Sequence, residues 1–155
     1  MKSLRWMAAI ATLASHLPAQ AATTDPEVII YRVSGVLDSG GPGPTGFATA
    51  IFCTNFSGTT ELVRIVVRSP SAVVLANVAF PLPHLNTLPM STKPTNVYNA
   101  TPLNTGGIGG IGTAAIAATS VNVTCTAMQV DAASLTPIGI ALHMTRFNPA
   151  PGTQE

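Results

Sequence analysis

Residues 45–68, TGFATAIFCTNFSGTTELVRIVVR, contain the clearest strand signal in the sequence. In the second half of this stretch Val63, Ile65 and Val67 occupy alternate positions, and Arg64 and Arg68 fall on the opposite face. Side chains alternate between the two faces of a strand, so this pattern predicts a strand with one buried face. A slip of one residue would bury both arginines, and the pairing register is therefore expected to be well defined.

The first half of the stretch is apolar on both faces. Phe47, Ile51 and Cys53 share one face, and Ala50 and Phe52 share the other. This pattern predicts a central strand, because both faces of such a strand are covered. The intervening TNFSGTT supplies the Asn, Ser and Gly that are typical of turns, which predicts a hairpin.

Alternation and turn signals predict further strands before and after this hairpin. The expected strands are 28–37, 72–80, 113–120, 121–131 and 138–145, with short edge strands at 82–88 and 95–99 in the proline-rich stretch. The glycine-rich segments 38–46 and 104–112 lack the context of a phosphate or dinucleotide loop. We expect a loop at 38–46 and a loop or a bulged edge strand at 104–112. About seven or eight short strands predict an all-β fold, a single antiparallel β-sandwich, with a closed barrel as the alternative.

Residues 1–21 have the three parts of a secretory signal peptide. Lys2 and Arg5 form a basic region, residues 6–17 are a short apolar run, and AQA at 19–21 is a cleavage motif. The run is shorter than the roughly 20 apolar residues that span a bilayer. We therefore predict a secreted or periplasmic protein with no membrane span after cleavage.

The predicted mature chain, 22–155, forms one β-sandwich domain with a proline-containing tail at 146–155. Cleavage removes two of seven basic residues and no acidic one, so the net charge becomes 5 − 6 = −1. Nucleic-acid affinity comes mainly from neutralised phosphates, so no nucleic-acid partner is expected. The low charge and the Thr, Ser and Asn of the polar faces suit a cell-surface, matrix or carbohydrate partner.

Cys53 and Cys125 are the two cysteines of the chain. Each lies in a predicted strand with apolar neighbours, and export delivers both to an oxidising compartment. No redox or metal motif such as C-x-x-C occurs. We therefore predict one disulfide, and we expect it to join the two sheets. Closing 125 − 53 = 72 residues would contribute roughly 4 kcal/mol in the chain-entropy account.

Few residues in the predicted mature chain could perform catalysis or bind a metal. His84 and His143 are its only imidazole bases, no G-x-S-x-G motif occurs, and most carboxylates lie in predicted loops. Met90 and Met144 complete the weak candidates for a copper site, but His143 and Met144 point to opposite strand faces. We therefore expect no enzyme, no cofactor and no metal, and a secreted hydrolase or a periplasmic copper-binding protein are the alternatives.

Three stretches resemble a group of small exported bacterial proteins of uncharacterised function. They are CTNFSG at 53–58, ATSVNVTCTAM at 118–128 and RFNPAPGTQE at 146–155. The resemblance implies no activity, cofactor or site residue. The chain is also similar to chaperone–usher pilin subunits as an exported, disulfide-bonded sandwich, but the cysteines of those subunits lie closer together and their last strand has an alternating apolar pattern. The sequence therefore predicts a structural or binding role at or outside the cell envelope, with a pilin-like assembly subunit as a further alternative.

Overall fold

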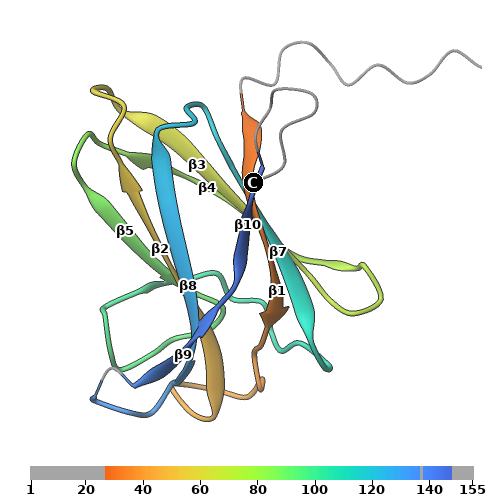
Figure 1. The fold of residues 1–155 in the computed structure, drawn as a ribbon. Helices are drawn as coiled ribbons and strands as arrows, with labels where there is room; N and C mark the ends of the chain where they lie inside the picture. Colours follow the sequence, from red (N-terminus) through yellow and green to blue (C-terminus); the bar gives the residue numbers. More distant parts are fainter. Residues whose placement is uncertain (1–26, 137, 148–155) are drawn as a thin grey trace, which may run out of the picture.

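The computed structural model describes residues 27–136 and 138–147, which form ten strands and no helix. The strands are β1 (Val28–Val36), β2 (Phe47–Asn55), β3 (Glu61–Arg68), β4 (Val74–Leu82), β5 (Thr87–Ser91), β6 (Thr101–Pro102), β7 (Gly112–Ala118), β8 (Val123–Asp131), β9 (Gly139–Leu142) and β10 (Met144–Arg146). They form two five-stranded sheets (Figure 1). Sheet A has the order β10-β1-β7-β3-β4 and sheet B the order β6-β5-β2-β8-β9. The pairing is antiparallel except between β5 and β6.

The inward faces of both sheets contribute to one hydrophobic core. Val63, Ile65 and Val67 of β3 are fully buried, which confirms the predicted buried face. Ile51 and Cys53 of β2 are also fully buried, and β2 lies in the middle of sheet B, as the apolar pattern predicted. Each large apolar side chain buried in this way contributes about 1.5–3 kcal/mol to folding.

The predicted hairpin at 45–68 is wrong, because β2 and β3 belong to different sheets. The buried side chain of Asn55 explains the crossing between the sheets. Its amide nitrogen donates to the carbonyls of Thr59 at 2.7 Å and Leu82 at 2.8 Å, and its oxygen accepts from the Ser57 amide at 2.8 Å. These bonds replace the ladder bonds that a hairpin would provide.

The predicted disulfide between Cys53 and Cys125 is confirmed, but its expected position across the two sheets is wrong. β2 and β8 are neighbours in sheet B, and the two cysteines are direct partners in their register. Their Cα atoms are 4.1 Å apart, near the roughly 4.5 Å of a non-hydrogen-bonded antiparallel pair. The bridge therefore links neighbouring strands inside one sheet.

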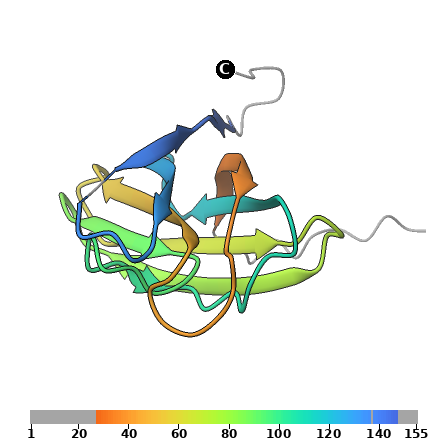
Figure 2. The ribbon, with the colours of Figure 1, turned by 90° about the horizontal axis from the view of Figure 1, so that it is seen from below.

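The predicted last strand, 138–145, is divided between the sheets. β9 pairs with β8 in sheet B, β10 pairs with β1 in sheet A, and His143 lies between them. Figure 2 shows this dark blue run passing from one sheet to the other. The two sheets are thus connected at one corner by a single continuous segment.

The proline-rich stretch departs most from the predictions. The expected strand 82–88 is interrupted at Leu85, whose φ is 61°, and β5 begins only at Thr87. The expected strand 95–99 is a loop, since Tyr98 and Asn99 have φ values of 70° and 44° that a strand cannot contain. The Tyr98 ring packs edge-on against Phe52 at 4.9 Å between centroids, so this loop covers part of the outer face of sheet B.

The predicted signal peptide, 1–21, and residues 148–155 of the predicted tail lie outside the described residues. The first residue of that tail, Arg146, is the last residue of β10. In the part of the chain that the structure describes, no helix has the length and hydropathy needed to cross a membrane.

Candidate functional site

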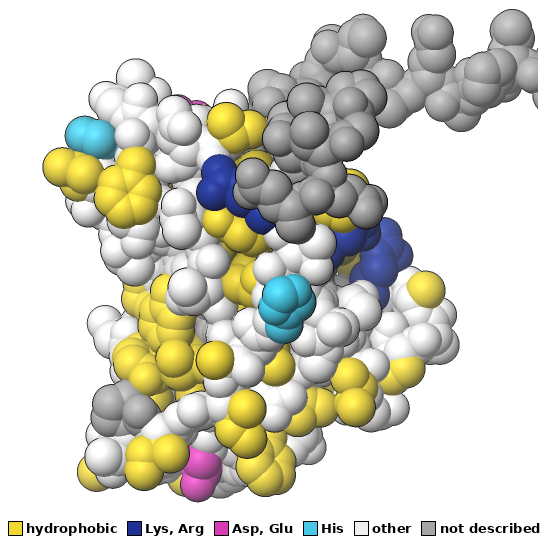
Figure 3. Space-filling model, in the orientation of Figure 1, with side chains coloured by type: hydrophobic (Ala, Val, Ile, Leu, Met, Phe, Trp, Pro, Cys, Tyr) yellow, Lys and Arg dark blue, Asp and Glu magenta, His cyan; other side chains and the backbone are white. Residues whose placement is uncertain are grey.

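One end of the shared core exposes large apolar side chains. Phe47 begins β2 and is 61% exposed. Ile138, just before β9, is 75% exposed, and Ile140, within β9, is 71% exposed. Ile111, before β7, is 67% exposed. We call these four residues the apolar end. Figure 3 shows apolar side chains gathered over the lower part of the molecule, around β8 and β9.

Two pockets make the apolar end continuous, since Phe47 lines both. The first has a volume of about 230 Å³ and is lined by Phe47, Gln129, Val130, Asp131, Ile138, Gly139 and Ile140. The second has a volume of about 260 Å³ and is lined by Leu37, Asp38, Ser39, Phe47, Ile108, Gly110 and Ile111. Contiguous exposed apolar surface is a common feature of interaction sites.

The apolar end adjoins an unpaired edge of sheet B. Among the described residues β9 pairs only with β8, so the other edge of β9 has free backbone donors and acceptors. Gly139–Leu142 has the sequence GIAL, without a charge or a proline. Charged residues and prolines usually protect edge strands from pairing. Because Gly139–Leu142 contains neither, β9 can accept a further strand.

The loop that leads to Phe47 is fixed by a buried charged pair. Lys93 and Asp38 are each 3% exposed, with Nζ and Oδ1 4.0 Å apart. Lys93 Nζ also donates to the carbonyls of Gly40 and Thr45, and Asp38 Oδ2 accepts from the Thr105 hydroxyl at 2.5 Å. Because buried charges are unfavourable without partners, these contacts hold the glycine-rich loop in one conformation.

Gly46 places Phe47 at the start of β2. Its φ is 68°, and a Cβ atom at this position would lie 2.3 Å from Ser39 Oγ. Its carbonyl accepts a hydrogen bond from the Ala132 amide at 2.7 Å, which joins the loop to the end of β8. Only glycine fits this backbone conformation and this contact.

The surroundings of Glu61 lower the pKa of its carboxyl group. It lies at the start of β3, where the chain enters sheet A after the crossing from β2. Hydrogen bonds from the hydroxyls of Ser57 and Thr119, and then from Thr59, lower the pKa of Glu61, although burial opposes the shift. The carboxylate therefore fastens the crossing segment to the end of β7.

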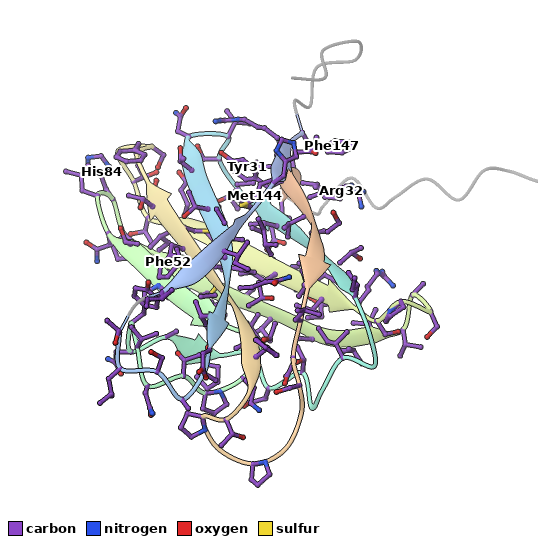
Figure 4. All side chains as sticks on the ribbon, turned by 60° about the horizontal axis from the view of Figure 1, so that its bottom comes forward. Tyr31, Arg32, Phe52, His84, Met144 and Phe147 are labelled. Atoms are coloured by element: carbon purple, nitrogen blue, oxygen red, sulfur yellow. A yellow bond between two sulfur atoms is a disulfide. The ribbon has the colours of Figure 1, made fainter. Side chains whose placement is uncertain are left out.

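The structure does not bring the weak copper candidates together. His84 lies in the turn after β4 and accepts a hydrogen bond from the Gly58 amide through Nδ1 at 3.0 Å. Met90 is fully buried in β5, Met144 packs against the core from β10, and His143 is exposed on the outer side of sheet A. Figure 4 shows His84 and Met144 on separate parts of the fold.

Over residues 27–136 and 138–147, no three His, Cys, Asp or Glu side chains lie close enough to hold a metal ion. Both cysteines of the chain are in the disulfide, so neither is available as a thiol ligand or nucleophile. A disulfide is compatible with an oxidising compartment outside the cytoplasm.

Sequence reasoning did not identify the apolar end or the buried charged pair. Ile138 and Ile140 were assigned to a strand, but alternation alone does not show that their shared face lies beyond the covered core. Lys93 is one of two lysines in the chain and follows a predicted edge strand, where a charge usually faces solvent.

Comparisons of the chain with protein-family models, with curated proteins and with solved structures gave no match.

Proposed function

We propose that this protein is an exported, non-enzymatic β-sandwich that binds an extended apolar segment of another polypeptide at its apolar end. The observation that supports this proposal most directly is the position of Phe47, Ile138 and Ile140 beside the free edge of β9. An added strand would continue sheet B through main-chain hydrogen bonds. Its alternate side chains would enter the pocket between β2 and β9, as in other cases of strand addition.

The expected affinity is modest. Covering Phe47, Ile138 and Ile140 would provide on the order of 5–9 kcal/mol, at about 1.5–3 kcal/mol for each side chain. Association itself costs roughly 4–15 kcal/mol, so the main-chain hydrogen bonds to β9 are needed for net binding. We therefore expect dissociation constants on the order of micromolar or weaker.

The export part of the proposal rests on the basic, apolar and AQA segments of residues 1–21 and on the disulfide of the folded chain. Binding of an extended segment fits either a structural role, in which the partner is another subunit, or capture of a separate polypeptide. A strand-binding surface needs no catalytic group, which agrees with the scattered positions of His84 and His143.

The test is an NMR titration of the oxidised, ¹⁵N-labelled protein with an acetylated peptide of alternating valine and threonine. We expect amide shifts at Gly139–Leu142 and at Phe47, and we expect Ile140→Lys to abolish them, because a charge on an edge strand prevents pairing. Phe56→Lys is the matched control, since Phe56 is 55% exposed at the opposite end of β2. Equal shifts in both variants, or no saturable shift in the wild type, would contradict the proposal.

A further inference from the structure

The outer face of sheet A contains a trough that is separate from the apolar end. It has a volume of about 260 Å³ and crosses β10, β1, β7 and β3. The register places Ser34 opposite Thr113, and Thr113 opposite Arg68. In the next row Arg32 is opposite Ala115. Small side chains on β1 and β7 therefore form the floor, and longer side chains stand at its margins.

Cationic and imidazole side chains border this floor on both sides. His143 precedes Met144, which pairs with Val33, so His143 lies beside Ser34 at one margin. Arg68 stands at the other margin, three strand spacings away, or about 14 Å at roughly 4.8 Å per spacing. Figure 4 shows Arg32 projecting from β1 on the side opposite Met144.

The positive charge of the trough has no acidic partner among the described residues. Arg68 donates to the Ala72 carbonyl at 3.0 Å, and the Arg32 guanidinium lies 5.0 Å from the centre of the Phe147 ring. Neither contact neutralises a charge. The ion pairs of the described chain are Arg64 with Glu27 and Lys93 with Asp38, so the trough retains two arginine charges.

The remaining lining is suited to a sugar ring. The hydroxyls of Ser34, Thr113 and Thr145 can donate and accept hydrogen bonds, and Ala115 offers an apolar surface to the C–H groups of a ring. Guanidinium groups bind sulfate and carboxylate with paired hydrogen bonds. The volume is slightly below the range of about 300–1,000 Å³ for small-molecule sites, which limits the ligand to about one ring.

We propose that this trough binds one anionic sugar unit of a glycan, with Arg32 and Arg68 contacting its sulfate or carboxylate and the three hydroxyls contacting its ring substituents. The site does not depend on strand binding, because it lies on the outer face of sheet A and the apolar end lies beside β9 of sheet B. Loss of one activity would therefore leave the other intact.

The test is a titration of the oxidised, ¹⁵N-labelled protein with N-acetylglucosamine 6-sulfate, glucuronic acid, neutral N-acetylglucosamine and inorganic sulfate. We expect one or both charged sugars to shift the amides of Ser34, Thr113 and Ala115, and the stronger of the two identifies the anionic group. Neutral sugar and inorganic sulfate should bind at least about tenfold more weakly, because each lacks one of the two kinds of contact.

Two variants give the matched comparison. The double variant Arg32→Gln, Arg68→Gln should weaken binding of the charged sugar by about tenfold or more, since it removes both cationic contacts. Arg64→Gln is the control, because Arg64 lies on β3, as Arg68 does, but is already paired with Glu27. Arg32 and Arg68 are both exposed, so the double variant should keep its melting temperature. Equal binding of neutral and charged sugar, or equal weakening by Arg64→Gln, would overturn the proposal.

Discussion

Lys93 and Asp38 form a charged pair beside the loop that precedes β2, and each is almost fully buried. The pair is tolerated because carbonyls, an amide and a hydroxyl supply the hydrogen bonds that water would otherwise provide. Asn55 lies at the other end of β2, where its side-chain amide supplies hydrogen bonds to the carbonyls of Thr59 and Leu82 in place of the backbone bonds of a sheet. At the scale of single residues, buried polar side chains hold the two segments that enter and leave β2: Lys93 and Asp38 hold the loop before it, and Asn55 holds the crossing after it.

Glu61 makes the stability of the protein depend on pH. Its pKa is lowered in the folded protein, so the ionised form is favoured by folding. The contribution is fully present above the unfolded value of about 4.3 and is lost as the pH falls through the lower folded value. Glu61→Gln should therefore lose less stability than the wild type as the pH is lowered through that window.

The measurement is the free energy of unfolding in urea, determined for both proteins at a series of acidic pH values. The difference between the wild type and Glu61→Gln should be largest near neutral pH and should shrink with acidification. Parallel curves for the two proteins would show that the hydroxyl contacts of Glu61 do not favour its ionised form.

The connection between β2 and β3 decides the topology at the scale of elements. The buried face of β3 was predicted correctly, because alternation is a local property of the chain. The hairpin prediction was wrong because alternation does not identify a strand's partner, and a polar turn can equally cross between sheets. For the same reason the change of sheet at His143 was not predicted, since alternation continues through it. The disulfide was likewise predicted to cross the sheets, because the partner of each strand was unknown.

Asn55→Ala tests this account of the crossing. It removes the donor to the Leu82 and Thr59 carbonyls and leaves both without their side-chain partner, which should lower the free energy of unfolding by about 2–4 kcal/mol. Chemical denaturation measures the change. Thr54→Ala is the control, because its hydroxyl contact with Thr87 is exposed, and its effect should be within about 0.5 kcal/mol. Equal effects of the two changes would contradict a special role for Asn55.

The molecule as a whole has one buried hydrophobic core, and apolar side chains that continue from one end of this core are exposed. The two sheets share that core, whereas at the apolar end Phe47, Ile138 and Ile140 lie beyond it. Alternation and turn signals predicted an all-β domain, because both are local properties of the sequence. The exposure of the apolar end was not predictable, since it depends on how far sheet A extends over sheet B.

Hydrogen exchange at β9 tests the central claim most directly, because strand addition must protect backbone amides and contact by side chains alone need not. Amide exchange is measured by NMR for the oxidised protein, free and saturated with the alternating valine–threonine peptide. We expect that amides within Gly139–Leu142 whose N–H groups face away from β8 exchange rapidly in the free protein and slow markedly in the complex. Unchanged exchange of these amides in a saturated complex, or protection confined to β4 at the far edge of sheet A, would contradict it.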